Sequence, residues 1–371
     1  HYALYIRFAD GNDELTDSLG SITGTSYSLE NIDKAGDVTF MVRAYGNSND
    51  ILYSDFAEMN IERLNAPKLI VANGKLSWEG VLNANSYLLF VQNPATSVYE
   101  LVDEYAGIAS YDFADRTAGA YDVRLIARNS LSQTEIKYAD SVMAEMTVTK
   151  LNTPINFTVY DGKFKFDMVT GAEGYEITIG KYKHKIGADQ TSDLELHSML
   201  AERVEDAKLV ATADGKITSS PTTIKVRMLS SPLGVKMVGG NIVWDKIQLP
   251  EGSSDAEYVV TIQKGTDVEK FDAGVNTSLA FPDLNWGTGE YYIYIQAKSG
   301  VYLDNGELVY QTISPYSTTY TVIIQDSVSI IQSVDGLLSW GSISTAVGYN
   351  VKIVDASGHE NVVYVTDASF D

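Results

Sequence analysis

The sequence predicts an all-β protein, a rod-like tandem array of seven-stranded β-sandwich domains. Three observations predict it: apolar residues alternate with other residues over short segments, helical periodicity is nearly absent, and a pattern of glycine, aromatic residue and tyrosine recurs along the chain. Turn-forming pairs such as Asn73-Gly74 and Asp335-Gly336 separate the alternating segments. Roughly seven short strands per 80 to 100 residues are typical of a β-sandwich.

The first recurring pattern places a glycine four residues before an aromatic residue, with a tyrosine further on. The aromatic-to-tyrosine distance is nine residues in three copies and 14 in the fourth, where "LPEGS" is inserted as a longer loop. From each tyrosine the chain alternates as a strand does. Aromatic residues that recur while the loops between them differ are typical of core packing. We expect these residues to form the cores: Trp78 with Tyr87, Phe166 with Tyr175, Trp244 with Tyr258, and Trp340 with Tyr349.

A second pattern is a strand that opens on glycine and reaches alanine eight residues later. It occurs from Gly36 to Ala44, from Gly119 to Ala127 and from Gly289 to Ala297. One further copy keeps only the alternation, with Glu205 in place of the glycine. The same copy carries Phe166 instead of tryptophan, so it has diverged. It also contains the one segment with helical character, Leu194 to Asp206, which predicts a short helical crossover.

Leucine-x-x-proline segments mark the start of three copies: Leu64 to Pro67, Leu151 to Pro154 and Leu229 to Pro232. Proline lacks an N–H and suits the first residues of an edge strand. Since no Gly/Ser-rich or Pro-rich linker separates the copies, neighbouring domains are expected to abut. The expected domains are repeat 1 (1–63, partial, C-terminal strands), repeat 2 (64–150), repeat 3 (151–228, divergent), repeat 4 (229–326) and repeat 5 (327–371, partial, N-terminal strands).

Taken together, the aromatic residue, the tyrosine that opens the following strand and the Gly-x-Tyr-x-Val-x-x-x-Ala strand resemble tandem fibronectin type III domains, which are immunoglobulin-like β-sandwiches. The resemblance covers essentially the whole chain, and the style of the repeats is similar to that of bacterial cell-surface or secreted proteins. It implies spacing, adhesion or accessory roles and no intrinsic catalysis. A fold alone does not determine a function.

Composition narrows the classes of function. The 371 residues include no cysteine, which excludes disulfides, thiolate metal sites and cysteine nucleophiles. There are 49 acidic and 27 basic residues, and the formal net charge of −22 repels a phosphate backbone, so no nucleic-acid partner is expected. No apolar run approaches 18 residues, so no membrane span is expected in this segment.

The sequence offers no catalytic constellation. The four histidines, His1, His184, His197 and His359, are scattered over three repeats without metal-ligand spacing, so we expect no enzyme activity and no cofactor. Calcium is the one metal with a candidate site, because Asp10, Asp13 and Asp17 fall in one acidic segment after the first strand. The spacing of an EF-hand is absent, and a solvated acidic turn is the alternative.

Repeat 4 holds the candidate ligand contacts. Trp286 has no counterpart in the other repeats and is expected either to cap the core or to be exposed as a contact. Alternation directs some tyrosines of this repeat outward, where tyrosine is adhesive, and Tyr292 and Tyr294 are candidates to bind a glycan or a host protein. The alternative is that the tyrosines simply cover the sheet. The group comprises Tyr291, Tyr292, Tyr294, Tyr302, Tyr310, Tyr316 and Tyr320.

We therefore expect a non-enzymatic stalk, spacer or adhesion segment of a larger extracellular bacterial surface protein, with neighbouring domains of the same longer chain as its first partners. Three alternatives remain open. One is an adhesin that binds a glycan or host protein through residues 229–326, and another is a set of accessory domains of a secreted carbohydrate-active enzyme. The third is a filament subunit formed by strand exchange; against it, both end repeats contain the tyrosine strand, at Tyr2 and Tyr349.

Overall fold

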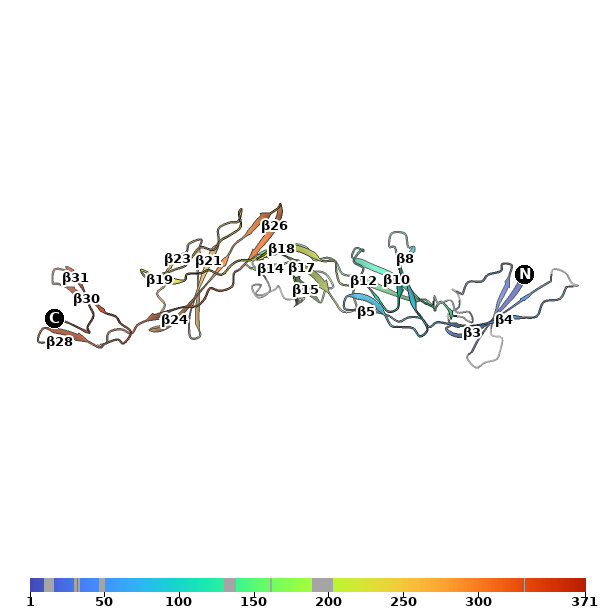
Figure 1. Ribbon diagram of the computed structural model, residues 1–371, viewed down its shortest axis with the longest axis horizontal. Helices are drawn as coiled ribbons and strands as arrows, with labels where there is room; N and C mark the ends of the chain where they lie inside the picture. Colours follow the sequence, from blue (N-terminus) through green and yellow to red (C-terminus); the bar gives the residue numbers. More distant parts are fainter. Residues whose placement is uncertain are drawn as a thin grey trace. The chain divides into compact units, whose positions relative to one another are not determined.

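A computed structural model of the chain describes residues 1–9, 17–29, 32, 34–46, 51–129, 138–160, 162–188, 203–329 and 331–371 (Figure 1). The chain divides into two compact units. Unit 1 comprises His1–Phe157, Lys165–Ser192 and Ala207–Thr223, and unit 2 comprises Thr158–Phe164, Asp193–Asp206 and Ile224–Asp371. Every regular element of the described residues is a β-strand, so the all-β prediction is confirmed.

Repeat 2, in unit 1, consists of two layers. A three-stranded sheet has the order β5-β6-β9 and a four-stranded sheet has the order β12-β10-β7-β8. Side chains of Leu76, Tyr87, Leu89, Val123 and Leu125 are buried between them because successive residues of a strand point to opposite faces. The strands are β5 (Leu69–Ala72), β6 (Lys75–Trp78), β7 (Ser86–Gln92), β8 (Tyr99–Ala106), β9 (Ser110–Tyr111), β10 (Gly119–Arg128) and β12 (Ala144–Lys150).

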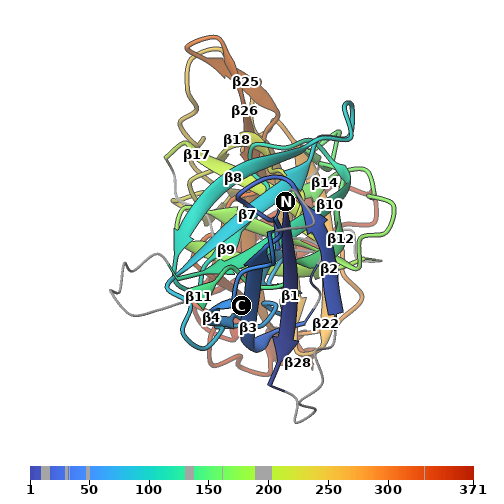
Figure 2. The same cartoon turned by 90° about the vertical axis from the view of Figure 1, so that its right-hand side faces the viewer.

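Repeat 1, also in unit 1, forms a sheet like the four-stranded layer of repeat 2. Its strand order is β11-β4-β3-β1-β2, in which β11 comes from repeat 2 (Figure 2). Ile6, Ile32, Val38 and Ile61 are buried together in one cluster. The strands are β1 (Tyr2–Phe8), β2 (Asp17–Ile22), β3 (Gly36–Ala44), β4 (Ala57–Arg63) and β11 (Tyr138–Ala139).

Repeat 3 contributes strands to both units. In unit 1, β15 pairs with β16 on one side and with β17 on the other. The helix predicted over Leu194–Asp206 lies mostly outside the described residues, but its last two residues are in strand β17, so the helix does not extend to Asp206. The strands are β13 (Thr158–Tyr160), β14 (Lys163–Lys165), β15 (Gly174–Ile179), β16 (Tyr182–Gly187), β17 (Glu205–Thr212) and β18 (Thr222–Met228).

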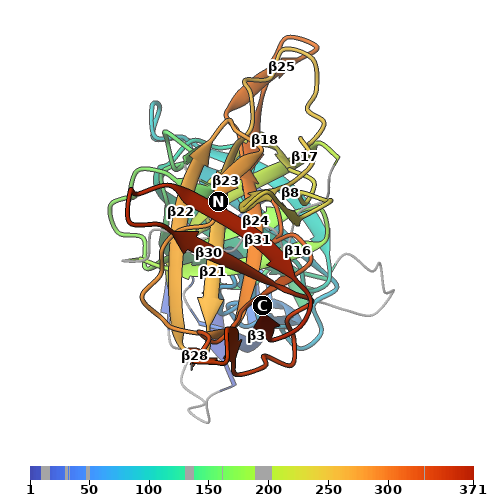
Figure 3. The same cartoon turned by 90° about the vertical axis from the view of Figure 1, so that its left-hand side faces the viewer.

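Repeat 4, in unit 2, again has a three-stranded sheet, β19-β20-β23, and a four-stranded sheet, β22-β21-β24-β27, whose long strands lie side by side in Figure 3. A hairpin of β25 and β26 follows β24. Trp244, Tyr258 and Tyr291 are buried in the core. The strands are β19 (Lys236–Val238), β20 (Asn241–Val243), β21 (Glu257–Lys264), β22 (Asp267–Gly274), β23 (Ser278–Ala280), β24 (Gly289–Lys298), β25 (Val301–Asp304), β26 (Glu307–Thr312) and β27 (Tyr320–Ile324).

Repeat 5, in unit 2, has a three-stranded sheet, β28-β29-β32, and a hairpin of β30 and β31. The rings of Trp340 and Tyr349 lie 5.3 Å apart, and both residues are only partly buried because a two-stranded layer covers them. The strands are β28 (Ile331–Val334), β29 (Leu337–Trp340), β30 (Tyr349–Val354), β31 (Glu360–Val365) and β32 (Ser369–Phe370).

The recurring tyrosine makes the same contact in four repeats. Its ring packs on the preceding aromatic, at 5.8 Å for Trp78 and Tyr87 and at 4.6 Å for Phe166 and Tyr175. Its hydroxyl accepts a hydrogen bond from the backbone N–H three residues after that aromatic. The donor and acceptor atoms lie 2.7 Å apart for Val81 and Tyr87, 2.7 Å for Val169 and Tyr175, 3.0 Å for Ile247 and Tyr258, and 2.9 Å for Ile343 and Tyr349. The tyrosine therefore anchors the loop between the two strands, including the longer loop with "LPEGS".

A second tyrosine marks the start of the glycine strand in repeats 2 and 4. The Tyr121 hydroxyl donates to the carbonyl oxygen of Thr117 at 2.9 Å, and the Tyr291 hydroxyl donates to that of Gly287. This bond back to the chain a few residues upstream is the tyrosine corner of immunoglobulin-like sandwiches. Gly119 and Gly289, with φ of 146° and 126°, allow the chain to turn into the strand at this corner.

We expect Trp78→Phe to be tolerated far better than Trp78→Ala. Alanine removes a ring that is 2% exposed, which costs about 3–5 kcal/mol, whereas phenylalanine keeps most of the packing, as Phe166 does in repeat 3. The Trp78 indole N–H has no hydrogen-bond partner among the described residues, so phenylalanine loses no bond there. Hydrogen exchange of repeat 2 in the full chain, followed by mass spectrometry, measures both effects.

Tyr87→Phe provides the matched control for the hydroxyl, because it removes only the bond from Val81 and should cost about 1 kcal/mol. Equal destabilisation by Trp78→Phe and Trp78→Ala would show that the indole has a role other than filling the core.

Candidate functional site: the joints between repeats

The sequence-predicted metal and histidine residues do not gather in the described part of the chain, where no group of three or more His, Asp or Glu residues could hold a metal ion. Asp10, Asp13 and His197 lie outside the described residues, and Asp17 begins β2. His1 stacks on Tyr45 with ring centroids 5.3 Å apart. His184 and His359 are exposed in repeats 3 and 5.

Trp286 covers the end of the repeat 4 core. Its ring is partly buried and stacks on Tyr291 with centroids 6.0 Å apart and an angle of 6° between the planes. Contrary to expectation, it has a counterpart: Arg116 also lies five residues before the corner tyrosine, with its guanidinium 5.9 Å from the Tyr121 ring. The two side chains differ in chemistry but cover the same ring, so Trp286 occupies a capping position.

The outer face of the four-stranded sheet of repeat 4 carries Tyr292 and Tyr294, and Tyr316, from the connection between β26 and β27, packs against Tyr294. The Tyr292 hydroxyl donates to Glu290 at 2.9 Å, and this bond raises the pKa of Tyr292. The Tyr294 hydroxyl donates to Gln263, and its partly buried ring lies 5.5 Å from that of Tyr316; burial raises the pKa of Tyr294. Tyr292 and Tyr316 remain 36% and 41% exposed, so these two rings are accessible to a ligand.

A serine fixes the connection after the glycine strand in repeats 1 to 4. We call Ser54, Ser141, Ser219 and Ser314 the clamp serines. The Oγ of each accepts a hydrogen bond from the N–H of the alanine that pairs with the recurring tyrosine of the neighbouring strand, and the N–H of each donates to the carbonyl oxygen of the same alanine. In repeat 3 this alanine is Ala211, six residues after Glu205, so Glu205 does not occupy the register of the motif glycine. The Oγ distances are 2.9 Å to Ala44, 2.9 Å to Ala127, 2.9 Å to Ala211 and 2.8 Å to Ala297.

The residue two positions before a clamp serine pairs with the last strand residue of the preceding repeat. At joint 1, between repeats 1 and 2, Arg63 pairs with Ala139; at joint 2, Lys150 pairs with Ile217; at joint 3, Met228 pairs with Thr312. All three pairings are parallel. At joint 2 the Leu151 N–H donates to Ile217 at 3.1 Å and the Ile217 N–H donates to Thr149 at 2.9 Å. Consecutive repeats therefore share backbone hydrogen bonds.

A buried cation fills joints 1 and 2. The Lys150 Nζ donates to the carbonyl oxygens of Phe113 at 2.6 Å and Arg116 at 2.6 Å in its own repeat, and to Ser220 Oγ at 2.9 Å in the next. Burial lowers the pKa of Lys150. Arg63 likewise donates to Ile32 in repeat 1 and to Asp140 in repeat 2. The leucines that follow the last strands, Leu64, Leu151 and Leu229, are buried at 1%, 3% and 2% exposure.

The glycine of the first motif lies directly against the next repeat. A Cβ atom on Gly74 would come within 1.7 Å of Thr218 Oγ1, and one on Gly162 within 2.9 Å of Ile313 Cβ. Thr218 and Ile313 each immediately precede a clamp serine, and the Thr218 N–H donates to the Gly74 carbonyl at 3.0 Å. Glycine is therefore favoured at these positions for two reasons. A Cβ atom would clash with the next repeat, and the backbone has a positive φ, 71° at Gly74 and 70° at Gly162.

A cleft of about 940 Å³ opens beside joint 2, lined by repeats 2 and 3. Both lysine and carboxylate side chains line it, and two ion pairs among them are Lys75 with Asp112 at 3.6 Å and Lys183 with Glu176 at 2.7 Å. The cleft is a polar groove of mixed charge, which gives no preference for a ligand of one sign.

No protein-family model matches the chain, and no curated protein sequence matches it. Among solved structures, the crystal structure of chicken CNTN1 FN1-FN3 domains is similar, with 12% sequence identity over 70% of this chain and 98% of that chain and a TM-score of 0.22. The two-layer strand order and the tyrosine corners of repeats 2 and 4 are features of immunoglobulin-like β-sandwiches. No helix of the described residues could span a membrane.

We expect Lys150→Ala to loosen joint 2. The variant leaves the Phe113 and Arg116 carbonyls without this donor, which should cost about 1–3 kcal/mol and speed hydrogen exchange at Ile217 and nearby amides. Lys68→Ala is the matched control, because the Lys68 side chain is 68% exposed and its ion pair with Glu79 contributes little. Exchange at Ile217 that does not differ between the two variants would mean that Lys150 does not stabilise the joint.

Proposed function

We propose that the chain is a non-enzymatic spacer segment of an extracellular bacterial surface protein, in which seven-stranded fibronectin type III-like domains follow one another as a rod. The observation that carries the proposal is the sharing of backbone hydrogen bonds across three successive joints. A spacer must resist bending where domains meet, and these bonds act at that place. The net charge of −22 keeps a long molecule of this kind soluble.

The energies of the contacts support a fixed orientation at each joint. A hydrogen bond contributes about 1 kcal/mol and a buried leucine about 2 kcal/mol. Joint 2 has the backbone bonds at Ile217, the bonds of Lys150 and buried Leu151, so its contacts sum to a few kcal/mol, well above the thermal energy. Two repeats joined only by a flexible linker would lack all of these contacts.

Spin labels on either side of joint 2 test the proposal. The chain has no cysteine, so Leu82→Cys in repeat 2 and Tyr182→Cys in repeat 3 accept labels at positions that are 79% and 46% exposed. We expect one narrow distance distribution by pulsed electron paramagnetic resonance, and a broader one when Gly74→Ala is added, because the new methyl group clashes with Thr218.

Gly240→Ala is the matched control for the backbone. Gly240 has a positive φ of 82° but no described atom within 4 Å of its Cβ position, so its substitution strains the turn without touching a joint. A broad distribution in the parent chain, or equal broadening by both glycine variants, would contradict a braced spacer.

A second candidate function is adhesion through repeat 4, favoured by the exposed rings of Tyr292 and Tyr316. A glycan or a protein ligand would stack on these rings. Accessory domains of a secreted carbohydrate-active enzyme and a filament subunit remain proposals that no contact of the described residues favours.

If repeat 4 is adhesive, the double variant Tyr292→Ala with Tyr316→Ala should lose at least tenfold in affinity for any glycan bound on an array. Tyr182→Ala, which removes a ring 46% exposed in repeat 3, should leave binding unchanged. Equal binding by the two variants, or no binding by the parent chain, would remove this candidate.

A further inference from the structure

Repeat 1 exposes a short apolar segment in the connection between β3 and β4. Ile51, Leu52 and Tyr53 are 56%, 82% and 58% exposed. Single exposed apolar residues are ordinary, but three in succession are the kind of surface that marks an interaction site.

The position of this segment relative to Ser54 shows that it is equivalent to the segments that form joints 2 and 3. Ser54 makes the same bonds to Ala44 as the other clamp serines make to their alanines, with its N–H 3.0 Å from the Ala44 carbonyl oxygen. Leu52 therefore occupies the position of Ile217 and Thr312, which pair with a terminal strand at joints 2 and 3. Those two residues are 0% exposed, whereas Leu52 is 82% exposed.

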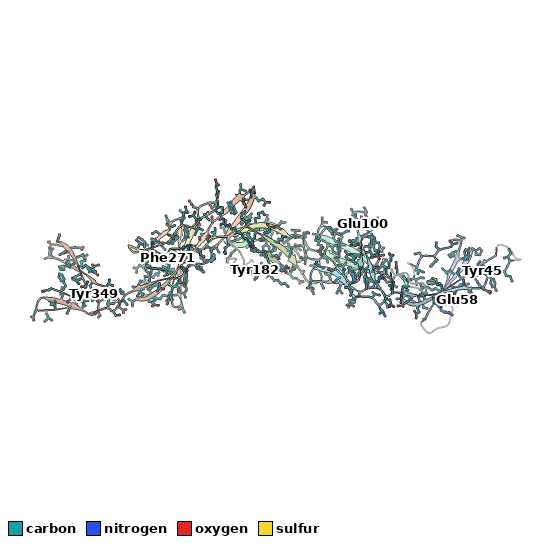
Figure 4. The ribbon with its side chains drawn as sticks, viewed as in Figure 1. Tyr45, Glu58, Glu100, Tyr182, Phe271 and Tyr349 are labelled. Carbon is teal, nitrogen blue, oxygen red and sulfur yellow. The ribbon has the colours of Figure 1, made fainter. Side chains whose placement is uncertain are left out.

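Tyr53 is held in place by its own repeat. The Arg43 guanidinium lies 4.4 Å from the Tyr53 ring and 4.8 Å from the Phe56 ring. Arg43 also donates to the Tyr45 hydroxyl at 3.2 Å, and the Tyr45 and Tyr53 rings lie 6.3 Å apart (Figure 4 labels Tyr45). At joints 2 and 3 the residue in the position of Tyr53 contacts the glycine of the preceding repeat. Contacts within repeat 1 therefore hold the Tyr53 ring at this position without a partner.

We propose that Ile51–Tyr53 is a docking edge for the terminal strand of another repeat of this kind, a strand that ends in a basic residue followed by leucine. The strand lies parallel to the segment, its last residue pairs with Leu52, and the N–H of its leucine donates to the Leu52 carbonyl oxygen, as Leu151 donates to Ile217. Three joints of the same chain show this pairing at the equivalent position. The inference rests on the proposed spacer function, because it uses the same pairing, but the two can fail separately: peptide capture tests this edge, whereas the spin-label distances test joint 2.

Disulfide trapping on the full chain tests the proposal. Leu52→Cys provides the single thiol of a chain that otherwise has none. The probe is a synthetic peptide with the sequence of residues 144–154 carrying Lys150→Cys, presented as its mixed disulfide with glutathione. The chain thiolate attacks the peptide sulfur and releases glutathione, so an aligned pair reacts faster. We expect capture at least tenfold faster than by Leu82→Cys, whose parent side chain is 79% exposed.

A second peptide that also carries Leu151→Pro lacks the N–H that bonds at joint 2, and the tenfold advantage should disappear with it. Equal capture rates at the two chain positions, or equal rates for the two peptides, would overturn the proposal. A third outcome would also overturn the proposal: the Leu52→Cys chain forms covalent dimers faster than the Leu82→Cys chain but captures the peptide no faster. The edge would then bind a second copy of this chain.

Discussion

The hydrogen bonds between each clamp serine and its alanine are the interaction on which the joints depend. The serine is tied to the alanine through both its side chain and its main chain, and its hydroxyl donates to the next carbonyl, as Ser141 does to Val142 at 2.8 Å. The connection is thus fixed to the sheet two residues after the position that pairs with the preceding repeat. Its backbone can then pair with a terminal strand without a large loss of conformational entropy. The clamp serine in this way helps to connect the sheet of its own repeat to the terminal strand of the preceding repeat.

The Gly-aromatic-Tyr motif combines an internal role with an external one. The tyrosine and the aromatic residue stabilise the repeat that contains them, through a buried ring pair and a bond to the adjacent loop. The glycine of the same motif contacts the next repeat at joints 2 and 3. At Gly240 no described atom approaches, and the positive φ alone accounts for the glycine there. The motif glycine therefore recurs for two physical reasons, the positive φ of its turn and the lack of space for a Cβ atom at a joint. The contacts of each glycine show which reason applies.

The sequence was sufficient for the all-β class and for the aromatic motif because a two-residue period directly reports which side chains face inward. It did not reveal the clamp serines. They follow their alanines by 10, 14, 8 and 17 residues in repeats 1 to 4, because the connections differ in length, so no fixed spacing marks them. The counterpart of Trp286 was missed because Arg116 covers the same ring with a different chemistry. The parallel pairing between repeats joins residues far apart in the chain, so no local sequence pattern predicts it.

The three joints are built with different chemistry. Joint 2 has a single paired residue and a buried lysine, whose lowered pKa reflects the cost of taking the charge out of water. Joint 3 has Met228 at that position, and there the pairing extends over four residues, from Lys225 to Met228. The hairpin of β25 and β26 supplies this longer ladder, and Lys225 adds an ion pair with Glu307 at 3.2 Å. Joint 3 thus combines the longer backbone ladder with an uncharged residue at this position, whereas joints 1 and 2 combine shorter pairings with a buried cation.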